Sequence, residues 1–369
     1  MHSLIKWPGG KTSEYNIIKQ FIPQNYDKYI EPFFGGGAVF FNMAPQKNSI
    51  INDISENLIN FYRYIQSCNS QIKNYLYALN DDWQQLKMIS EPYVLKLCEC
   101  FISLRNNDIT VSELRDVIDH SCRHITDLLL ESSKIMTEKN LIYNELFRMV
   151  SDKTIRTLSN ELKHDKQLSQ SDLICNITTG FMSGYYMCIR SVFNSFNRCQ
   201  APSGEYKTAL FYFVREFCYG SMFRYNKFGE FNIPYGGIAY NNKDFKRKID
   251  ILFSQDVQNY LKNTQIFNTD FSEILDMAQV DDFVFIDPPY DTDFSEYENK
   301  VFNENDQRRL ALKLHTLPAK FLLIIKNTPL IDSLYSNLGY NIYAFDNRYS
   351  YCVKGRNDRN AVHLIITNY

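Results

Sequence analysis

Short apolar runs that end in an acidic or polar residue occur near both ends of the chain, and each is predicted to be a β-strand. The runs are 28–30, 49–53, 265–267, 283–286, 321–325 and 363–366. Helices are expected at 17–22 and 305–314 and after the first two runs. A strand, a Gly-rich turn, a helix and a second strand that ends in an acid are typical of an open α/β sheet that binds nucleotides. We therefore predict an α/β fold whose sheet is assembled from both ends of the chain.

The middle of the chain follows a different pattern. Residues 84–179 contain no Gly and a single Pro, and their apolar residues recur at helical spacing. Twelve Lys and Arg against fourteen Asp and Glu give 84–180 a net charge of −2. We predict a helical insertion at 84–183 that has no preference for phosphate.

The next segment, 184–249, is basic. Ten Lys and Arg against four Asp and Glu give 184–248 a net charge of +6, with Tyr, Phe and Asn interleaved. The stretch Arg224–Asn232 predicts a β-hairpin that closes near Lys227–Gly229. Basic, aromatic and amide side chains together favour binding to a nucleic acid, although composition alone is equally consistent with a solvated basic loop.

Composition limits the class of protein. The chain has 369 residues, 44% of them hydrophobic, and a net charge of −2, so a nucleic-acid surface requires local segregation of charge. Nine Cys without a C-x-x-C pair indicate reduced thiols and no zinc site. Without an apolar run of about 20 residues or a signal sequence, we expect a soluble, cytoplasmic protein that does not associate with membranes.

The strongest chemical signal is Asp287-Pro288-Pro289-Tyr290, directly after the apolar run 283–286. Ligands of open α/β sheets bind at the carboxyl ends of strands. An aromatic amine is a poor nucleophile unless acceptors hold both of its N–H groups, and the Asp287 carboxylate and the Pro288 carbonyl can supply two. Proline adds no competing amide donor, and Tyr290 offers a face on which a base can stack. The tetrapeptide therefore predicts a catalytic loop.

A second signal is the stretch 29–40, in which three glycines separate a strand from a helix. Such glycines let the backbone approach a ligand closely. Asp53 ends the next strand, where an acid typically binds ribose hydroxyls. The loop and the acid together predict a nucleotide cofactor.

Two weaker signals are found at residues 6–12 and at residues 270–271. Residues 6–12 carry Gly-Gly-Lys-Thr, but Ile5 stands where a phosphate-binding loop needs Gly, so a cation at Lys11 and an indole at Trp7 over a small zwitterionic ligand are expected instead. Asp270 and Phe271 follow a strand, and the acid can accept from an adenine amine or cap a helix.

In their order these segments resemble the Dam-type family of N6-adenine DNA methyltransferases. The resemblance rests on the Trp-Pro-Gly-Gly-Lys start, the Glu-Pro-Phe-Phe-Gly-Gly-Gly loop, Asn-Asp53, the 224–236 pattern, Asp-Pro-Pro-Tyr and the ending 364–369. It implies a Rossmann-like S-adenosylmethionine-dependent methyltransferase sheet with a helical insertion and a small hairpin-containing target-recognition region. The split catalytic domain would comprise 1–83 and 250–369, with the insertion at 84–183 and target recognition at 184–249.

The resemblance also implies roles for individual residues. Catalysis would involve Asp287, Pro288, Pro289 and Tyr290. S-adenosylmethionine would be bound by Trp7, Lys11, Phe34, Gly35, Gly37, Asp53, Asp270, Phe271 and Asp287. Double-stranded DNA would be contacted by Arg190, Asn194, Met222, Arg224, Asn226, Asn232 and Tyr235. The target adenine would be flipped out of the duplex, because a stacked base cannot present its amine to the donor.

The recognition region departs from members that read GATC. Residues 220–224 are Gly-Ser-Met-Phe-Arg, and Gly237-Ile238-Ala239-Tyr240 stands where those members have Arg-Tyr-Lys, so GATC is not predicted. The enzyme would act in restriction-modification beside a separate cognate endonuclease, or in phage or host DNA marking. The alternatives are a methyltransferase for RNA or a protein amide, and a catalytically silent DNA-binding relative. The sequence indicates no oligomeric state.

Overall fold

The chain folds into two compact units. The computed structural model describes residues 3–45, 47–199, 204–290, 296–297, 300–336, 338–348 and 360–369. The first, here called the sheet unit, comprises Met1–Asn69, Met222–Gly229 and Ile251–Tyr369. The second, the helical unit, comprises Ser70–Ser221 and Glu230–Asp250.

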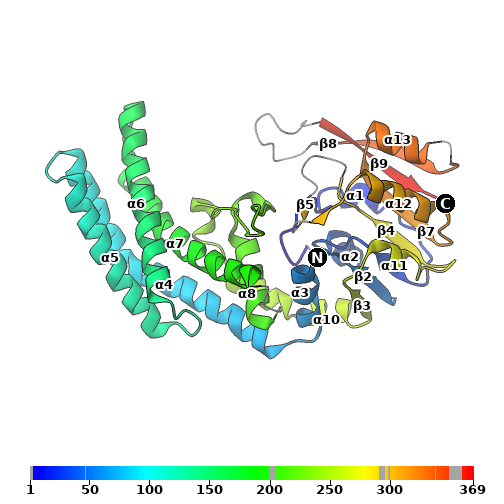
Figure 1. Ribbon diagram of the computed structural model, residues 1–369, viewed down its shortest axis with the longest axis horizontal. Coiled ribbons are helices and arrows are strands. Elements are labelled where there is room, and N and C mark those ends of the chain that lie inside the picture. Colours follow the sequence, from blue (N-terminus) through cyan, green and yellow to red (C-terminus); the bar gives the residue numbers. More distant parts are fainter. Residues whose placement is uncertain are drawn as a thin grey trace. The chain divides into compact units, whose positions relative to one another are not determined.

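A seven-stranded sheet is the centre of the sheet unit (Figure 1). Its strands, in spatial order, are β3 (Thr264–Phe267), β2 (Ser49–Asn52), β1 (Tyr29–Glu31), β4 (Phe283–Ile286), β7 (Lys320–Lys326), β9 (Asn360–Thr367) and β8 (Asn341–Arg348). The first five are parallel, and β9 runs antiparallel to both of its neighbours. The predicted Rossmann-like α/β fold is confirmed. Chain order reverses between β1 and β4, which is where ligands of such sheets bind.

Burial explains why the predicted strands form. All four residues of β4 are buried, as are the five central residues of β7, because helices cover both faces of a parallel sheet. Successive side chains face opposite ways: Ile30 joins the core under one set of helices, whereas Tyr29 packs against Phe40. Strand β8 was not predicted from the sequence. Its residues 342–345 are apolar, but the side chains at 341–344 are exposed at the sheet edge.

Short helices connect the strands. They are α1 (Tyr15–Ile18), α2 (Ala38–Met43), α3 (Glu56–Gln66), α10 (Gln255–Leu261), α11 (Phe271–Leu275), α12 (Glu304–His315) and α13 (Pro329–Tyr335), and a two-stranded ribbon pairs β5 (Glu296–Tyr297) with β6 (Lys300–Val301). Helix α12 begins with a capping box between Asn303 and Asp306, and it is the crossover helix expected at 305–314. Its Leu310 and Leu314 belong to the core on one face of the sheet.

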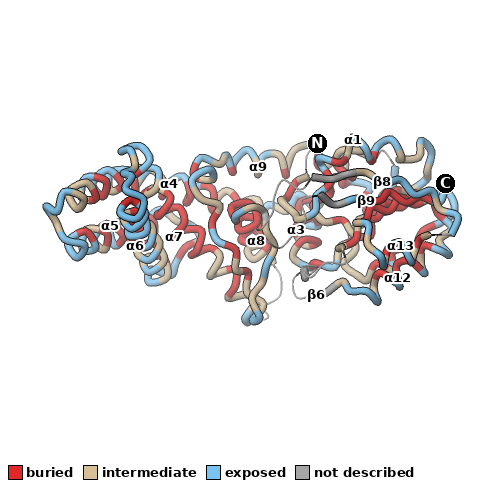
Figure 2. Tube along the Cα trace, turned by 90° about the horizontal axis from the view of Figure 1, so that it is seen from above, coloured by how far each residue is buried: buried red, intermediate tan, exposed pale blue. Residues whose placement is uncertain are grey.

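Long helices build the helical unit. They are α4 (Ser70–Arg105), α5 (Val111–Ser132), α6 (Lys139–His164), α7 (Gln170–Arg198) and α8 (Glu205–Phe217), followed by the 3-10 turns η1 (Tyr219–Ser221) and η2 (Ile238–Tyr240) and by α9 (Phe245–Leu252). Every residue of α7 from Thr179 to Ile189 is buried (Figure 2), as in a central helix surrounded by others. A Cβ on Gly184 would lie 2.8 Å from the Leu146 Cα, so glycine lets α6 and α7 approach closely.

The basic region differs from its prediction. Helix α7 continues through the boundary expected at 183/184, and α8 follows it, so the described part of 184–249 is largely helical. A tight turn does close at 226–229, where the Gly229 N–H donates to the Asn226 carbonyl and Gly229 has φ 74°. Among the described residues, no strand longer than an isolated bridge flanks this turn.

None of the helices that the structure describes combines the length and the apolar character needed to cross a lipid bilayer.

Candidate active site

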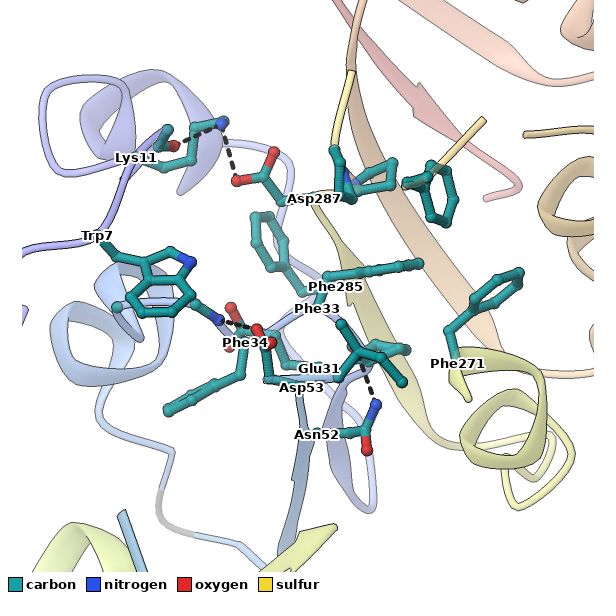
Figure 3. A pocket seen from close by; sticks show the side chains of 18 of the residues that line it. Trp7, Lys11, Glu31, Phe33, Phe34, Asn52, Asp53, Phe271, Phe285 and Asp287 are labelled. Carbon is teal, nitrogen blue, oxygen red and sulfur yellow. Dashed lines mark hydrogen bonds and ion pairs between the residues drawn. The ribbon is translucent and has the colours of Figure 1, made fainter. Parts of the chain in front are cut away.

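A pocket opens at the carboxyl ends of β1, β2, β3 and β4 within the sheet unit (Figure 3). The strand ends and the N-terminal loop supply its polar lining, and aromatic rings supply much of the rest. Its principal lining residues are Trp7, Lys11, Glu31, Phe33, Phe34, Gly35, Asn52, Asp53, Asp270, Phe271, Phe285, Asp287, Pro288, Pro289, Tyr290 and Phe302. The pocket therefore lies at the position where the topology of the sheet predicts a ligand site.

The loop after β4 is fixed from two directions. The Lys11 ammonium lies 2.7 Å from an Asp287 carboxylate oxygen and also donates to the Gly9 carbonyl at 2.8 Å (Figure 3). From α12, the buried Gln307 side chain donates to the Pro289 carbonyl at 2.9 Å. The catalytic loop predicted from the sequence is thus held at both of its ends before any ligand binds.

Burial and charge act against each other in the Lys11–Asp287 pair. Burial raises the pKa of Asp287, and the neighbouring Lys11 ammonium opposes that increase. For Lys11, burial alone would lower the pKa, but the charges of Asp287, Tyr290 and Glu14 raise it well above its usual value. Lys11 therefore remains a cation, and its charge favours the carboxylate form of Asp287.

The Gly-rich loop after β1 lies directly against Trp7. A Cβ on Gly35 would be 2.8 Å from the indole Cδ1, and Gly35 has φ +50°, so a larger residue is excluded by both contact and backbone. A Cβ on Gly36 would be 3.1 Å from the Ile5 carbonyl. The glycines therefore let the loop lie close to the N-terminal segment that carries Trp7.

Asp53 and its neighbour Asn52 organise the strand ends. Asp53 accepts from the backbone N–H of Gly35 at 2.9 Å and of Ser55 at 2.9 Å. The Asn52 amide donates to the carbonyls of Pro32 and Thr269, which joins the loops after β1 and β3. Asp53 therefore fixes the Gly-rich loop after β1 against the end of β2.

Asp270 caps a helix, which is one of the two roles considered for it, and also lines the pocket. It is the N-cap of α11, accepting from the Ser272 N–H at 2.9 Å, and it lines the pocket beside Phe271. Arg309 donates to the same carboxylate at 2.7 Å. Burial raises the pKa of Asp270, but the hydrogen bonds from Ser272 and Arg309 outweigh it and lower the pKa.

Almost all of the predicted cofactor and catalytic residues line this pocket. The exception is Gly37, which is absent from the lining and instead begins α2 with φ +67°. A Cβ there would meet the rings of Phe34 and Phe41 at 2.7 Å. Gly37 therefore supports the loop by its conformation and packing.

The predicted DNA-binding residues are not all available to a ligand. Asn194 and Tyr235 are buried, and Asn194 exchanges two hydrogen bonds with the backbone of Phe231. The half-buried Arg190 donates to the Ile233 carbonyl at 3.0 Å. Asn194 and Arg190 therefore hold the 230–236 segment through its backbone, and contact of Asn194, Tyr235 and Arg190 with DNA stays a prediction.

The other four predicted DNA-binding residues keep some exposed surface. Arg224 is exposed, and Met222, Asn226 and Asn232 are half-buried. Of these, Met222, Arg224 and Asn226 belong to the sheet unit.

Sequence reasoning missed two residues that shape the site. Glu31 lines the pocket at the end of β1, is buried, and accepts from the Tyr29 hydroxyl at 2.6 Å. Burial raises its pKa well above the usual value. The sequence did contain a signal for Glu31, because this acid directly precedes Pro32 at the end of a predicted strand. No local signal marks Gln307, because its partner Pro289 lies 18 residues away in the sequence.

The fold and the pocket are those of a Rossmann-like methyltransferase, and comparison with known proteins gives the family. The model of the D12 class N6 adenine-specific DNA methyltransferases matches residues 7–175 and 153–351. The chain belongs to this family, which confirms the resemblance inferred from its motifs and makes it an adenine-specific DNA methyltransferase.

Two of the relatives named here align over almost the whole chain, and a third aligns over about a third of it. The Type II methyltransferase M.CviBI of Paramecium bursaria Chlorella virus NC1A is 25% identical over 380 residues, covering 100% of each chain. The Type II methyltransferase M.MjaIII of Methanocaldococcus jannaschii is 27% identical over 384 residues, covering 99% of this chain and 98% of the relative. The retron Ec67 DNA adenine methylase of Escherichia coli is 38% identical over 138 residues, covering 37% and 46% respectively.

Proposed function

We propose that this enzyme transfers a methyl group from S-adenosylmethionine to the N6 amine of an adenine flipped out of double-stranded DNA. The observation that carries the proposal is the position of Asp287, which ends the central strand β4 and lines the same pocket as the Gly-rich loop after β1. A methyl donor and an amine acceptor must meet in one place, and this pocket supplies groups suited to both.

The lining fits the donor. Aromatic rings from Phe34 and Phe271 suit a purine, the Asp53 carboxylate suits ribose hydroxyls, and the acids suit a cationic sulfonium and amino group. Trp7, Lys11, Gly35, Asp270 and Asp287 complete the proposed binding set, and Gly37 supports the loop. When bound, S-adenosylmethionine supplies an electrophilic methyl group.

The catalytic loop is suited to activating the amine. We assign the Asp287 carboxylate and the Pro288 carbonyl as acceptors for the two N6 hydrogens, which directs the nitrogen lone pair towards the methyl group. Pro289 and Tyr290 shape the loop, and the Tyr290 ring offers a stacking face for the base. Because Lys11 and Gln307 fix this loop in advance, little reorganisation is needed when the base arrives.

The segment that we assign to DNA recognition adjoins the pocket. The ring centroid of Phe223 lies 4.9 Å from that of Trp7, and both residues belong to the sheet unit. Arg224, beside Phe223, is exposed, and Asn226 precedes the turn closed by Gly229. We propose that Met222, Arg224 and Asn226 contact DNA from here, and, separately, that Asn232 of the helical unit contacts DNA.

The relatives named Type II methyltransferases suggest the biological setting. We propose a role in restriction-modification, with a separate endonuclease that reads the same site, or in marking of phage or host DNA.

Two experiments test the proposed function. Modification-sensitive sequencing of DNA from a host that expresses the chain should show N6-methyladenine at one short motif. Purified enzyme should transfer labelled methyl from S-adenosylmethionine to duplex DNA, but not to RNA or protein. Transfer to RNA or to a protein amide, or methylation on cytosine, would contradict the proposal.

A further inference from the structure

A second pair of ionisable groups lies behind the Lys11–Asp287 pair. The His363 Nδ1 is 3.5 Å from a Glu14 carboxylate oxygen. The Tyr290 ring connects the two pairs, because its centroid is 5.2 Å from the Lys11 ammonium and 5.3 Å from the His363 ring centroid. All five residues belong to the sheet unit.

This arrangement is buried. Lys11 is 3% exposed, Glu14 8% and His363 1%, so water screens their charges little. Charges so enclosed act on one another more strongly than surface ion pairs do. Glu14 and His363 are therefore placed to influence Asp287 without lining the pocket that holds the reactants.

The fold fixes both groups. The Glu14 N–H donates to the Lys11 carbonyl at 3.2 Å, so both side chains lie on the single turn of backbone that leads into α1. His363 lies on β9, which pairs on both sides with β7 and β8, and its ring packs against Phe345 as well as Tyr290. Neither Glu14 nor His363 can move far without disturbing a turn or the sheet.

The two residues act on Asp287 with opposite sign. Burial is the largest influence and raises the pKa of Asp287; the Glu14 charge raises it further, whereas Lys11 and His363 lower it. Among the described residues, Glu31, at the end of β1, and Tyr290, in the same loop as Asp287, also lie near it, and Asp53, Asp270 and Asp306 line the same pocket.

We propose that Glu14 and His363 are positioning residues for methyl transfer, which set the orientation and charge of the Lys11–Asp287 pair from behind the catalytic loop. The proposal deepens the proposed function and rests on the assignment of Asp287 as an acceptor for the adenine amine. It links the last strand of the chain to the first loop and makes both part of the catalytic apparatus.

The test is the pH dependence of the single-turnover rate of methyl transfer, at saturating donor and duplex DNA. Activity requires Asp287 as a carboxylate, so the acid limb of the profile follows its pKa. Glu14→Gln removes a negative neighbour and should move this limb to lower pH. His363→Gln removes a neighbour that lowers the pKa of Asp287 and should move the limb to higher pH. Each shift is expected to be roughly 0.5–1 unit.

Matched variants separate charge from packing. Glu14→Asp keeps the charge and should keep the wild-type limb, whereas His363→Phe keeps the ring packing and should shift the limb as His363→Gln does. Glu273→Gln and His315→Gln, at exposed positions on α11 and α12, should leave the profile unchanged. Circular dichroism checks that each variant is folded across the pH range used.

Opposite shifts support the proposal. Shifts in the same direction, or no shift in folded variants, would overturn it and leave Asp287 as the acceptor. Failure of the proposed function has a different signature, because Asp287→Ala would then retain methyl transfer whatever the other profiles do.

Discussion

Buried polar side chains serve different purposes in the two units. In the sheet unit, Lys11 and Asp287 are largely enclosed, yet both line the pocket at the strand ends. In the helical unit, Asn194 is equally buried, but it bonds to the backbone of Phe231. The difference teaches that burial of a polar side chain does not by itself assign a role. Lys11 and Asp287 face a pocket that can hold a ligand, whereas both polar atoms of the Asn194 amide are bonded to the backbone of Phe231.

The largest effect should come from Asp287→Ala, which tests the role of the polar residues that line the pocket of the sheet unit. Loss of one acceptor for the amine should lower the methyl-transfer rate by about 10²–10³-fold or more, by analogy with removal of one preorganised hydrogen-bonding group from other active sites. Duplex binding should change little, because recognition is assigned elsewhere. Rapid-quench transfer and fluorescence-anisotropy titration measure the two quantities. A near-normal rate would refute the catalytic role.

The next largest effect is expected for Gly184→Leu, which tests the packing of the helical unit. The added side chain meets the backbone of α6 at Leu146, so the free energy of unfolding should fall by about 1–3 kcal/mol. Thermal or urea unfolding measures this. Gly204→Ala is the control, because a Cβ there meets nothing within 4 Å. Equal stability of the two variants would show that α6 and α7 are not so closely packed.

Asn194→Ala and Arg224→Ala together compare a buried residue that bonds to the backbone with an exposed residue assigned to DNA contact. Asn194→Ala should lower the free energy of unfolding by about 1–3 kcal/mol, because it leaves buried backbone groups of Phe231 without partners. Arg224→Ala should leave stability unchanged and weaken binding or relax sequence preference by about 1–3 kcal/mol if Arg224 reads a base. The assignments would be reversed if Asn194→Ala changed only DNA preference.

The smallest effect concerns Asp82, a buried acid of the helical unit that accepts from Ser133 and Tyr185. Burial raises its pKa to about 6, against the lowering effect of those hydrogen bonds. The pKa of Asp82 in the folded state lies above its value of 3.8 in the unfolded chain. The contribution of Asp82 to the free energy of unfolding is therefore greatest below about pH 4 and declines as the pH rises through about 6.

Asp82→Asn should remove this dependence and raise stability at neutral pH by about 1–2 kcal/mol. Thermal unfolding of both proteins between pH 4 and 7 measures it. Parallel profiles for the wild type and the variant would contradict the assignment.

The local pattern of apolar and polar residues was sufficient to predict many of the strands of the sheet and many of the residues that line the pocket. Strand β4 matches the run 283–286, and the residues that follow it at the strand tip line the pocket. These features are predictable because an apolar run and the loop after it are contiguous in sequence. In contrast, β8 was not predicted although its residues 342–345 are apolar, because it forms an exposed edge strand through pairing with β9, which local pattern does not show.

Long-range contacts were beyond local pattern. Glu14 and His363 are separated by nearly the whole chain, and only the pairing of β9 with β7 brings His363 near the catalytic loop. The hairpin expected at Arg224–Asn232 was only partly right, because turn chemistry at Gly229 is local whereas strand pairing beside it is not. The burial of Asn194 and Tyr235 was not predicted for the same reason, because it depends on contacts with residues that are distant in sequence.

The most direct test of the central claim is a structure of the enzyme with duplex DNA and a non-reactive analogue of S-adenosylmethionine. We predict that the analogue occupies the pocket between Trp7, Asp53 and Phe271, with an extruded adenine whose amine is held by the Asp287 carboxylate and the Pro288 carbonyl. An analogue bound away from the tip of β4, or an adenine that remains stacked in the duplex, would contradict the account.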